Sequence, residues 1–396
     1  MAAACTLCLP VAAKATAPSL GIDLRAALAA PGLSGDASAA MVVDLRTGRT
    51  IFAQNPDTPL QPASNEKLCV AYTALVELGP GYRFRTDVLG EGRRIGRVWH
   101  GRLVLKGHGD PTLATRDLKR LAARIDALGI RRITGRIVGD DSWFDDRDAV
   151  VGWLPSFVHQ ESAPLSALVA NRGIRARRPA ADPALAAAAL FAKLLRARGI
   201  EVRDAITGRA HEHAERLVSD HSPRLATLLT VIDSDSDNFA AEMVLKAIGR
   251  EVLGKGTSAA GAAVVRRELA AAGVPLGGVR IVDGSGLSRE NRVTARELAS
   301  LLVAIWRDAK LRPLVRDSLA VAGISGTLRH RLDYRPARGR VRAKTGTTAI
   351  ASALSGYVGR RYAFVVLHNG YPVASWTARE AQDRFVTKLA ALAASR

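Results

Sequence analysis

Two changes in hydrophobic periodicity divide this 396-residue chain and limit the folds it can adopt. A helix-spaced segment near the N-terminus gives way to short strand-like runs separated by glycines, and helix-spaced segments then return. The C-terminal part holds further strand-like runs and a last amphipathic helix. The sequence therefore predicts an α+β fold in which one domain, residues 18–81 and 218–396, is interrupted by a smaller α+β domain, residues 82–217.

The segments that flank the interruption are expected to build one antiparallel sheet flanked by helices. The runs AAMVVDL and RTIFA are joined by Arg46-Thr47-Gly48, which predicts a hairpin at a sheet edge. The runs SALSGYVG and YAFVVLHNG and a helix from about Thr377 are expected to complete that sheet. Inside the interruption we expect a helix over LKRLAARIDALG and another over residues 182–199, and an irregular linker over residues 211–222.

The composition is that of a globular protein, with 48% hydrophobic and 24% charged residues. Outside the extreme N-terminus no run approaches the roughly 18 to 20 apolar residues of a membrane-spanning helix. The formal charge of +20 comes mostly from arginine and fits either an anionic partner, such as a cell-wall polymer, or a coding bias. No nucleic-acid partner is expected, because the basic residues are spread along the chain without a DNA- or RNA-binding motif.

The first 17 residues, MAAACTLCLPVAAKATA, are small and apolar and end in the A-x-A pattern of a signal-peptidase site. They predict a signal peptide over residues 1–17 and export to the periplasm or the cell wall. No basic residue precedes the apolar run, which also fits an ordinary N-terminus or a start codon assigned too late. Cleavage after Ala17 would remove Cys5 and Cys8 and leave Cys69, which we expect to face the core from a helix.

Three short motifs stand in order along the chain and hold the candidate catalytic residues: Ser64-Asn65-Glu66-Lys67, Ser236-Asp237-Asn238 and Lys344-Thr345-Gly346. Each motif alone is weak. The ordered set S-x-x-K, S-D-N and K-T-G, however, is found in β-lactamases and penicillin-binding proteins. The combination therefore predicts an enzyme with a serine nucleophile.

Ser64 stands just before a helix-spaced run and is expected to open a helix. Lys67 then lies one turn on, on the same face, close enough for its amine to take the serine proton if desolvation lowers its pKa. The helix N-terminus also directs N–H groups towards a developing oxyanion. The alternative is that Ser64 only caps the helix and Lys67 is solvated.

Ser236 and Asn238 are two residues apart between helix-spaced segments. In a loop, this spacing can turn a hydroxyl that relays protons and an amide that holds a substrate amide into one cleft. The alternative is a polar loop that only joins two helices.

Lys344, Thr345, Gly346 and Thr347 precede a strand-like run. They offer a cation, two hydroxyls and a glycine that lets a substrate backbone approach the strand, as suits a peptide ending in a carboxylate. The alternative is a basic turn before a strand.

Long flanking segments extend the motif match, and with them the chain resembles the D-alanyl-D-alanine carboxypeptidase/endopeptidase family of the penicillin-binding protein 4 type, the low-molecular-mass class C group. The segments are PASNEKL, IDSDSDNFAAEM, DGSGLSRENRVTARELASLL, GISGTLRHRL, AKTGTT, VVDLRTGRTIFAQN, LVLKGHGDPTL and GRIVGDDSWFDD. The resemblance implies the serine β-lactamase/DD-peptidase-like transpeptidase fold with an inserted domain. The run LSALVANRGIRARRPA leads directly into the next helix, so the third domain of larger members is expected to be absent.

The resemblance also implies a role for each motif residue. Ser64 would be the acylated nucleophile, Lys67 its base, and Ser236 with Asn238 the second element of the cleft. Lys344, Thr345 and Gly346 would form the third element. Thr347 would supply the second oxyanion N–H beside that of Ser64, and the hydroxyls of Thr345 and Thr347 would hold the terminal carboxylate.

The expected function is that of an exported serine DD-peptidase that acts on peptidoglycan stem peptides, with β-lactams as covalent inhibitors. Carboxypeptidase and endopeptidase action share the acyl-enzyme and stay open. So do two alternatives: a β-lactamase or esterase on the same fold, which differs in how quickly the acyl-enzyme is hydrolysed, and a non-catalytic cell-wall-binding protein.

No cofactor or metal is expected. Four acidic residues, Asp140, Asp141, Asp145 and Asp146, do not follow a calcium-loop pattern and predict a solvated acidic loop. His211 and His213 lack further ligands nearby in the sequence and are expected at the surface.

Overall fold

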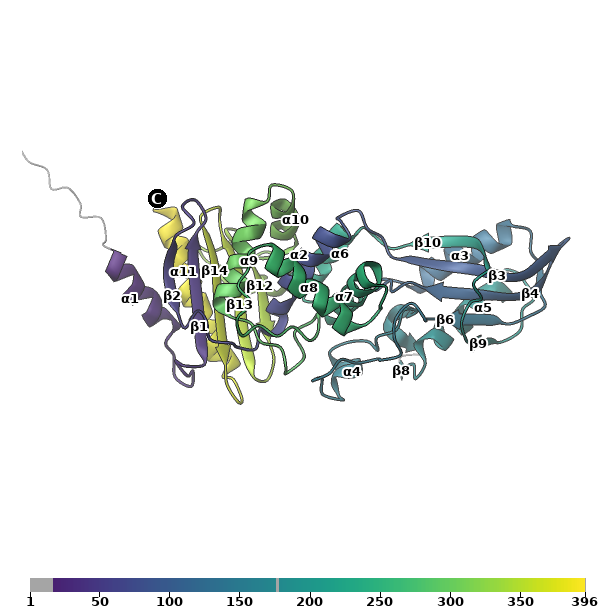
Figure 1. The fold of residues 1–396 in the computed structure, drawn as a ribbon, viewed down its shortest axis with the longest axis horizontal. Coiled ribbons are helices and arrows are strands. Elements are labelled where there is room, and N and C mark those ends of the chain that lie inside the picture. Colours follow the sequence, from purple (N-terminus) through teal and green to yellow (C-terminus); the bar gives the residue numbers. More distant parts are fainter. Residues whose placement is uncertain (1–16, 176–177, 396) are drawn as a thin grey trace, which may run out of the picture.

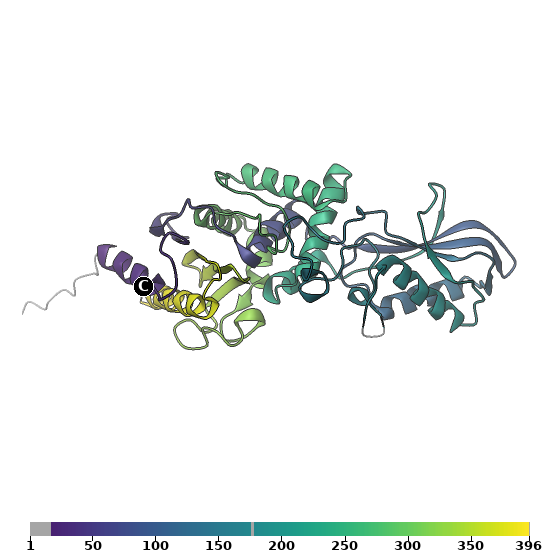
Figure 2. The same cartoon turned by 90° about the horizontal axis from the view of Figure 1, so that it is seen from below.

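The computed structural model describes residues 17–175 and 178–395, which form two large β-sheets at the two ends of an elongated molecule, with helices between them (Figure 1). The view from below shows the same separation (Figure 2). This is the α+β organisation, with one unit inserted into another, that the sequence predicts.

Six strands form the first sheet in the order β11-β12-β13-β14-β1-β2, and all neighbours are antiparallel. Their bounds are Ser38–Asp44 (β1), Thr50–Gln54 (β2), Ala320–Val321 (β11), Val341–Thr347 (β12), Ala351–Val358 (β13) and Tyr362–Asn369 (β14). The predicted hairpin is confirmed, because β1 and β2 pair across a turn in which Gly48 adopts a φ of 72°. The strand β2 lies at the sheet edge, as predicted.

Alternate residues of the central strands feed two cores on opposite faces of the first sheet. In β14, for example, Val365 packs in one core and Val366 in the other. Helices α1 (Ala17–Leu28) and α11 (Ser375–Ala394) lie side by side over the second face, and α9 (Ala295–Arg307) covers the first (Figure 2). Burial on both faces fixes the register of these strands, since a slip of one residue would exchange the two faces.

Several helices outside the inserted unit begin at a capping side chain, and one ends at a glycine. The helices between the sheets are Lys67–Glu77 (α2), Leu225–Ser234 (α6), Asn238–Leu253 (α7), Ser258–Ala271 (α8) and Leu311–Ser318 (α10). The side chains of Asp237, Thr257 and Thr294 cap α7, α8 and α9 by accepting hydrogen bonds from backbone N–H groups. Gly254, with a φ of 69°, ends α7 in the left-handed conformation.

The inserted unit is built on a mixed sheet with the strand order β10-β3-β4-β6-β9. Its strands are Arg85–Ile95 (β3), Val98–Gly107 (β4), Arg132–Ile133 (β5, paired with β4), Ile137–Asp140 (β6), Ala205–Thr207 (β9) and Glu215–His221 (β10); Ile174–Arg175 (β7) and Arg178–Pro179 (β8) pair apart from it. Its helices are Thr115–Ala127 (α3), Phe157–Gln160 (α4) and Pro183–Arg196 (α5). Both predicted helices are present, and the cap on α5 is Asp182.

The prediction of an irregular linker over residues 211–222 is wrong, because most of this segment forms the strand β10. This strand pairs antiparallel with β3 at the edge of the second sheet. Its side chains are largely polar because they lie near solvent, and Asp220 forms an ion pair of 2.7 Å with Arg120 of α3. An edge strand that exposes most of one face lacks the apolar alternation by which strands are recognised.

The acidic residues at the end of β6 and just after it do not form the solvated loop that the sequence predicts. Asp140 is fully buried and lies 3.2 Å from Lys106 Nζ. Asp145 accepts a hydrogen bond of 2.6 Å from Lys246, which is itself buried, whereas Asp146 is exposed. Periodicity could not reveal these cations, because both come from other segments of the chain.

The remaining predictions concern two histidines, one cysteine and the N-terminal segment. His211 and His213 are exposed and Cys69 is buried in α2, as predicted. The signal peptide predicted over residues 1–17 falls, except for Ala17, outside the described residues. In the part of the chain that the structure describes, no helix combines the length and apolar character needed to cross a membrane.

Candidate active site

The chain enters the candidate site through a 3₁₀ turn, Ala63–Glu66, that runs directly into α2. Ser64 is therefore at the start of a helical unit, as predicted, and its side chain is half-buried. The hydroxyl of Ser64 makes no helix-capping hydrogen bond, so the capping alternative is wrong. Instead, Lys67 Nζ lies 2.8 Å from Ser64 Oγ.

Lys67 is fully buried and its amine is oriented by three contacts. Besides Ser64 Oγ, it lies 2.7 Å from Asn238 Oδ1 and 2.7 Å from the carbonyl oxygen of Ser285. Both carbonyl-type oxygens can only accept, so they hold two N–H bonds of the amine. The third direction faces the serine hydroxyl. Burial, partly offset by nearby carboxylates, lowers the pKa of Lys67 to about 8, which makes a neutral, proton-accepting amine accessible near neutral pH.

The second motif lies between α6 and α7 and joins the two lysines. Ser236 has a φ of 63°, a left-handed conformation that costs about 1–2 kcal/mol for a residue with a Cβ. Its hydroxyl accepts a hydrogen bond of 2.8 Å from Lys344 Nζ. Asn238, the first residue of α7, accepts from Lys67 and donates to the carbonyl of Glu161 in the inserted unit. The structure thus brings both predicted side chains to one place.

Lys344 in β12 connects the third motif to the second. It is fully buried, and its amine also donates to the carbonyl of Thr345 at 2.8 Å. Burial, together with repulsion from Lys67, lowers the pKa of Lys344 well below its ordinary value. The hydroxyl of Thr345 is hydrogen-bonded at 2.8 Å to the hydroxyl of Thr327, which lies in a 3₁₀ turn between β11 and β12 and belongs to none of the three motifs.

Gly346 meets a packing requirement in addition to the role predicted for it. The sequence suggested that its missing side chain lets a substrate backbone approach. In addition, a Cβ at this position would lie 3.0 Å from Ala63 Cβ, from the Pro62 carbonyl and from Ser64 N. The glycine therefore allows β12 to lie directly against the turn that carries Ser64. This contact places Ser64 beside the strand of Thr345 and Thr347.

Two backbone carbonyls complete the site and were missed in the sequence. The carbonyl of Ser285 belongs to the glycine-rich run VDGSGLS, which lies outside the three motifs. Its position depends on Glu242, which accepts from Ser285 N at 2.8 Å. The carbonyl of Glu161 holds the Asn238 amide. A carbonyl carries no residue identity, so no motif could have indicated either contact.

Buried acidic side chains lie near Lys67 and its neighbour Glu66, and the motifs did not indicate them. Glu66 adjoins Lys67 in sequence, and burial with repulsion from neighbouring carboxylates raises its pKa well above the ordinary value. Burial also raises the pKa of Glu242 and of Glu297 to about 8. Within residues 17–175 and 178–395, no group of three or more His, Cys, Asp or Glu side chains has an arrangement suited to a metal ion.

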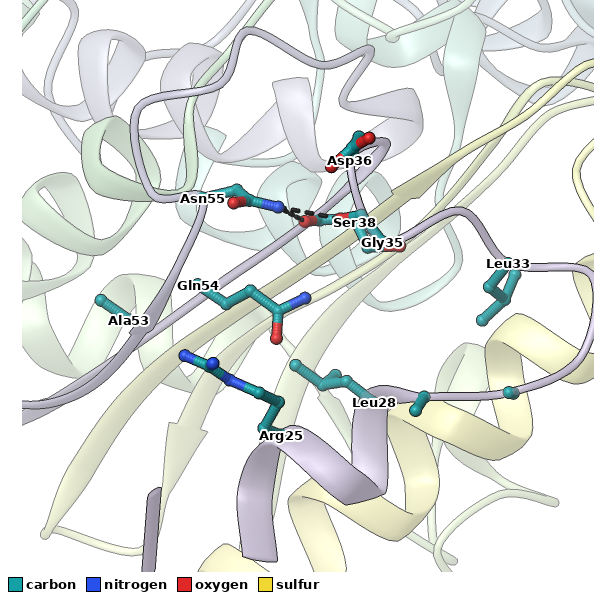
Figure 3. A pocket seen from close by; sticks show the side chains of 11 residues that line it. Arg25, Leu28, Leu33, Gly35, Asp36, Ser38, Ala53, Gln54 and Asn55 are labelled. Atoms are coloured by element: carbon teal, nitrogen blue, oxygen red, sulfur yellow. Dashed lines mark hydrogen bonds between the residues drawn. The ribbon is translucent and has the colours of Figure 1, made fainter. Parts of the chain in front are cut away.

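A hollow of about 500 Å³ lies at the far edge of the first sheet, between α1 and β2 (Figure 3). Arg25 and Gln54 line it, and Asn55 closes one side by donating hydrogen bonds to the carbonyls of Gly35 and Ser38. Three strands separate β2 from β12. The hollow is therefore distinct from the candidate active site.

A serine, a buried lysine bonded to it, and two further motifs joined through hydrogen bonds match a serine acyltransferase centre. A family model described as the D-Ala-D-Ala carboxypeptidase 3 (S13) family matches residues 20–181 and 172–392. The chain belongs to this family. It is therefore a serine-type D-Ala-D-Ala carboxypeptidase, as the sequence resemblance predicted.

Comparisons with individual proteins agree with the family. The D-alanyl-D-alanine carboxypeptidase of Actinomadura sp. is 32% identical over 88% of this chain and 80% of the relative. A carboxypeptidase of Mycobacterium tuberculosis is 34% identical over 96% of this chain and 86% of the relative. Penicillin binding protein 4 of Haemophilus influenzae shares the fold, with a TM-score of 0.83 and 24% identity over 94% of this chain and 98% of that structure. The predicted fold class is confirmed.

Proposed function

We propose that this carboxypeptidase removes the terminal D-Ala of peptidoglycan stem peptides through an acyl-enzyme on Ser64. The observation that carries the proposal is the 2.8 Å contact between Lys67 Nζ and Ser64 Oγ. Two carbonyl-type oxygens occupy the other N–H directions of the amine, so its lone pair, once it is neutral, faces the serine hydroxyl. That geometry suits a general base.

In the acylation step, neutral Lys67 accepts the proton of Ser64 as Oγ bonds to the carbonyl carbon of the penultimate D-Ala. The backbone N–H groups of Ser64 and Thr347 hold the oxyanion. The C–N bond then breaks, and the amine of terminal D-Ala leaves with a proton from Lys67, relayed through Ser236. Water attacks the ester with Lys67 as base and restores the free serine.

Substrate binding is assigned to the remaining motif residues. Asn238 holds a substrate amide, Lys344 orients Ser236, and the hydroxyls of Thr345 and Thr347 hold the terminal carboxylate, with Gly346 setting the position of the strand. Because only the leaving amine differs, the same acyl-enzyme serves cleavage of cross-bridges. β-Lactams acylate Ser64 in place of the peptide; a solved structure of the Haemophilus protein is described as complexed with a β-lactam.

The place of action and the division of the chain belong to this proposal. The enzyme is exported and acts in the periplasm or the cell wall, which its A-x-A segment and its peptidoglycan substrate support. Residues 18–81 and 218–396 form the peptidase domain and residues 82–217 the inserted domain. We place no third domain within residues 82–217, because the two pieces of the family match overlap at residues 172–181 and leave no unmatched segment between them.

The test is the intact mass of the protein during incubation with benzylpenicillin, with Ser64→Ala in parallel. We expect one persistent adduct that the variant lacks, and release of D-alanine from a peptide ending in D-Ala-D-Ala. Rapid loss of the adduct would indicate a β-lactamase. No adduct and no D-alanine release from well-folded protein would indicate a non-catalytic wall-binding protein instead.

A further inference from the structure

An arginine on the last helix contacts the open end of the active-site strand. Arg379, in the second turn of α11, lies with Nη2 3.3 Å from Thr347 Oγ1. Both residues are exposed, so this contact is at the surface of the site, where a substrate group could reach it.

 

Arg379 follows Thr347 by 32 residues, Asn238 by 141 and Lys67 by 312. It lies outside all three motifs, and only the packing of α11 against the first sheet brings it to Thr347.

The two carboxylates nearest to Arg379 on α11 are held by other groups. Glu380 accepts a hydrogen bond of 3.0 Å from Trp376 Nε1. Asp383, one turn further on, forms an ion pair of 2.7 Å with Arg331. In the described part of the chain, no carboxylate lies within 4.0 Å of the Arg379 guanidinium. Its charge is therefore available to an anion from outside the protein.

The position of Arg379 relative to the strand is fixed by buried contacts. Gln382, one turn along α11, donates a hydrogen bond of 3.0 Å to Ser352 Oγ, and both residues are buried. Ser352 pairs directly with Thr347 across β12 and β13. The helix is thus attached to the sheet at the level of Thr347, which keeps the guanidinium at the end of the strand.

We propose that Arg379 binds the free carboxylate of the residue that follows the scissile bond, and so selects peptides with an ionised C-terminus over amidated ones. This inference rests on the proposed function and assigns a specificity residue to the same site. Thr345 and Thr347 are two residues apart on β12, so their side chains share a face and can donate to the same carboxylate. The guanidinium adds charge-assisted hydrogen bonds beside them.

Arg379 supplies a positive charge that, unlike the charge of buried Lys344, does not decrease as pH rises. Burial and the neighbouring Lys67 lower the pKa of Lys344, which reduces its positive charge as pH rises. A guanidinium keeps its charge throughout the working range of pH. The carboxylate therefore meets a permanent cation at the exposed end of the strand.

The test compares two pairs of reagents: an acylated peptide ending in D-Ala-D-Ala with its C-terminal amide, and benzylpenicillin with its methyl ester. In Arg379→Gln, we expect the ratio of kcat/KM for acid over amide, and the same ratio of acylation rates, to fall about tenfold. In Arg379→Lys, both ratios should fall less, because the lysine keeps a positive charge. Arg384→Gln, an exposed arginine on the same helix that contacts the Ala29 carbonyl, should leave both ratios unchanged.

The possible outcomes distinguish a failure of this inference from a failure of the proposed function. A purely structural role of Arg379 would lower the rates for acid and amide alike and leave the ratios at the wild-type value, which would overturn the inference. If the wild type is acylated by benzylpenicillin and the ratios do not depend on Arg379, only the inference fails. If the wild type neither forms an adduct nor releases D-alanine, the proposed function fails and the inference fails with it.

Discussion

Arg172 of the inserted unit forms a two-point ion pair with Asp237, the central residue of the second motif, with Nη1 2.8 Å from Oδ1. The pair holds the pKa of the Asp237 carboxyl below its ordinary value, against the opposite effect of burial. Asp237 also caps α7, whose first residue is Asn238. The inserted unit therefore helps to position an amide that contacts Lys67.

Arg172→Gln should slow acylation by benzylpenicillin about tenfold, because it leaves the partly buried Asp237 carboxylate without its cation and loosens the start of α7. The rate is measured by intact mass at early times. Arg196→Gln, which removes an exposed ion pair with Asp204 elsewhere in the inserted unit, is the matched control and should have no effect. Equal rates for Arg172→Gln and wild type would show that the ion pair does not position the motif.

Much of the fold could be predicted because the spacing of apolar residues reflects which face of a helix or strand is buried. The hairpin β1–β2, the strands β13 and β14 and the helices α3 and α5 all lie where their spacing indicates. The strand β10 could not be predicted in this way. It lies at a sheet edge and pairs with β3, about 130 residues earlier, and neither property leaves an apolar alternation in its own sequence.

In the candidate site too, contacts between residues close in sequence could be predicted, and contacts between distant residues could not. The pairing of Ser64 with Lys67 follows from three residues of helical spacing, and it could be predicted. The carbonyls of Ser285 and Glu161 reach the site only through the fold. Gly346 shows a third case, in which the residue was recognised but its packing against the turn that carries Ser64 was not.

The rate of acylation by benzylpenicillin should rise with pH and level off near pH 8. Burial lowers the pKa of Lys67 to about 8, so the neutral amine that accepts the serine proton becomes scarcer below that pH. The expected slope is about tenfold per pH unit on the acid side. Stopped-flow acylation between pH 5.5 and 9 measures it, with circular dichroism at each pH to monitor folding. A rate that does not change over this range would argue against Lys67 as the base.

Gly346→Ala should lower both stability and acylation. The new methyl group would lie 3.0 Å from the turn that carries Ser64, so either β12 or the turn must shift. Overpacking of this kind costs about 1–3 kcal/mol of unfolding free energy. Urea denaturation measures the stability, and intact mass the acylation. Gly81→Ala is the control, because a Cβ there meets no atom within 4 Å. Normal acylation in Gly346→Ala would mean that the turn tolerates the displacement.

Stability should fall as pH rises from about 4.5 to about 8, and Glu297 should account for part of the fall. Burial raises the pKa of Glu297 from 4.5 to about 8 in the folded protein. Between these values the unfolded chain has lost the proton that the folded chain keeps, so the unfolding free energy decreases with pH by up to about 1.4 kcal/mol per pH unit. Below pH 4.5 both states are protonated and the effect vanishes.

Glu297→Gln keeps the shape of the side chain and an oxygen that can accept from Cys69, but it cannot ionise. The difference in unfolding free energy between variant and wild type should therefore grow in favour of the variant as pH rises through this window. The buried lysines contribute slopes of opposite sign, but they are common to both proteins and cancel in the difference. Urea denaturation at several pH values measures it, with Glu201→Gln, at an exposed position, as the control. A difference that does not vary with pH would mean that Glu297 ionises in the folded protein as it does in the unfolded chain.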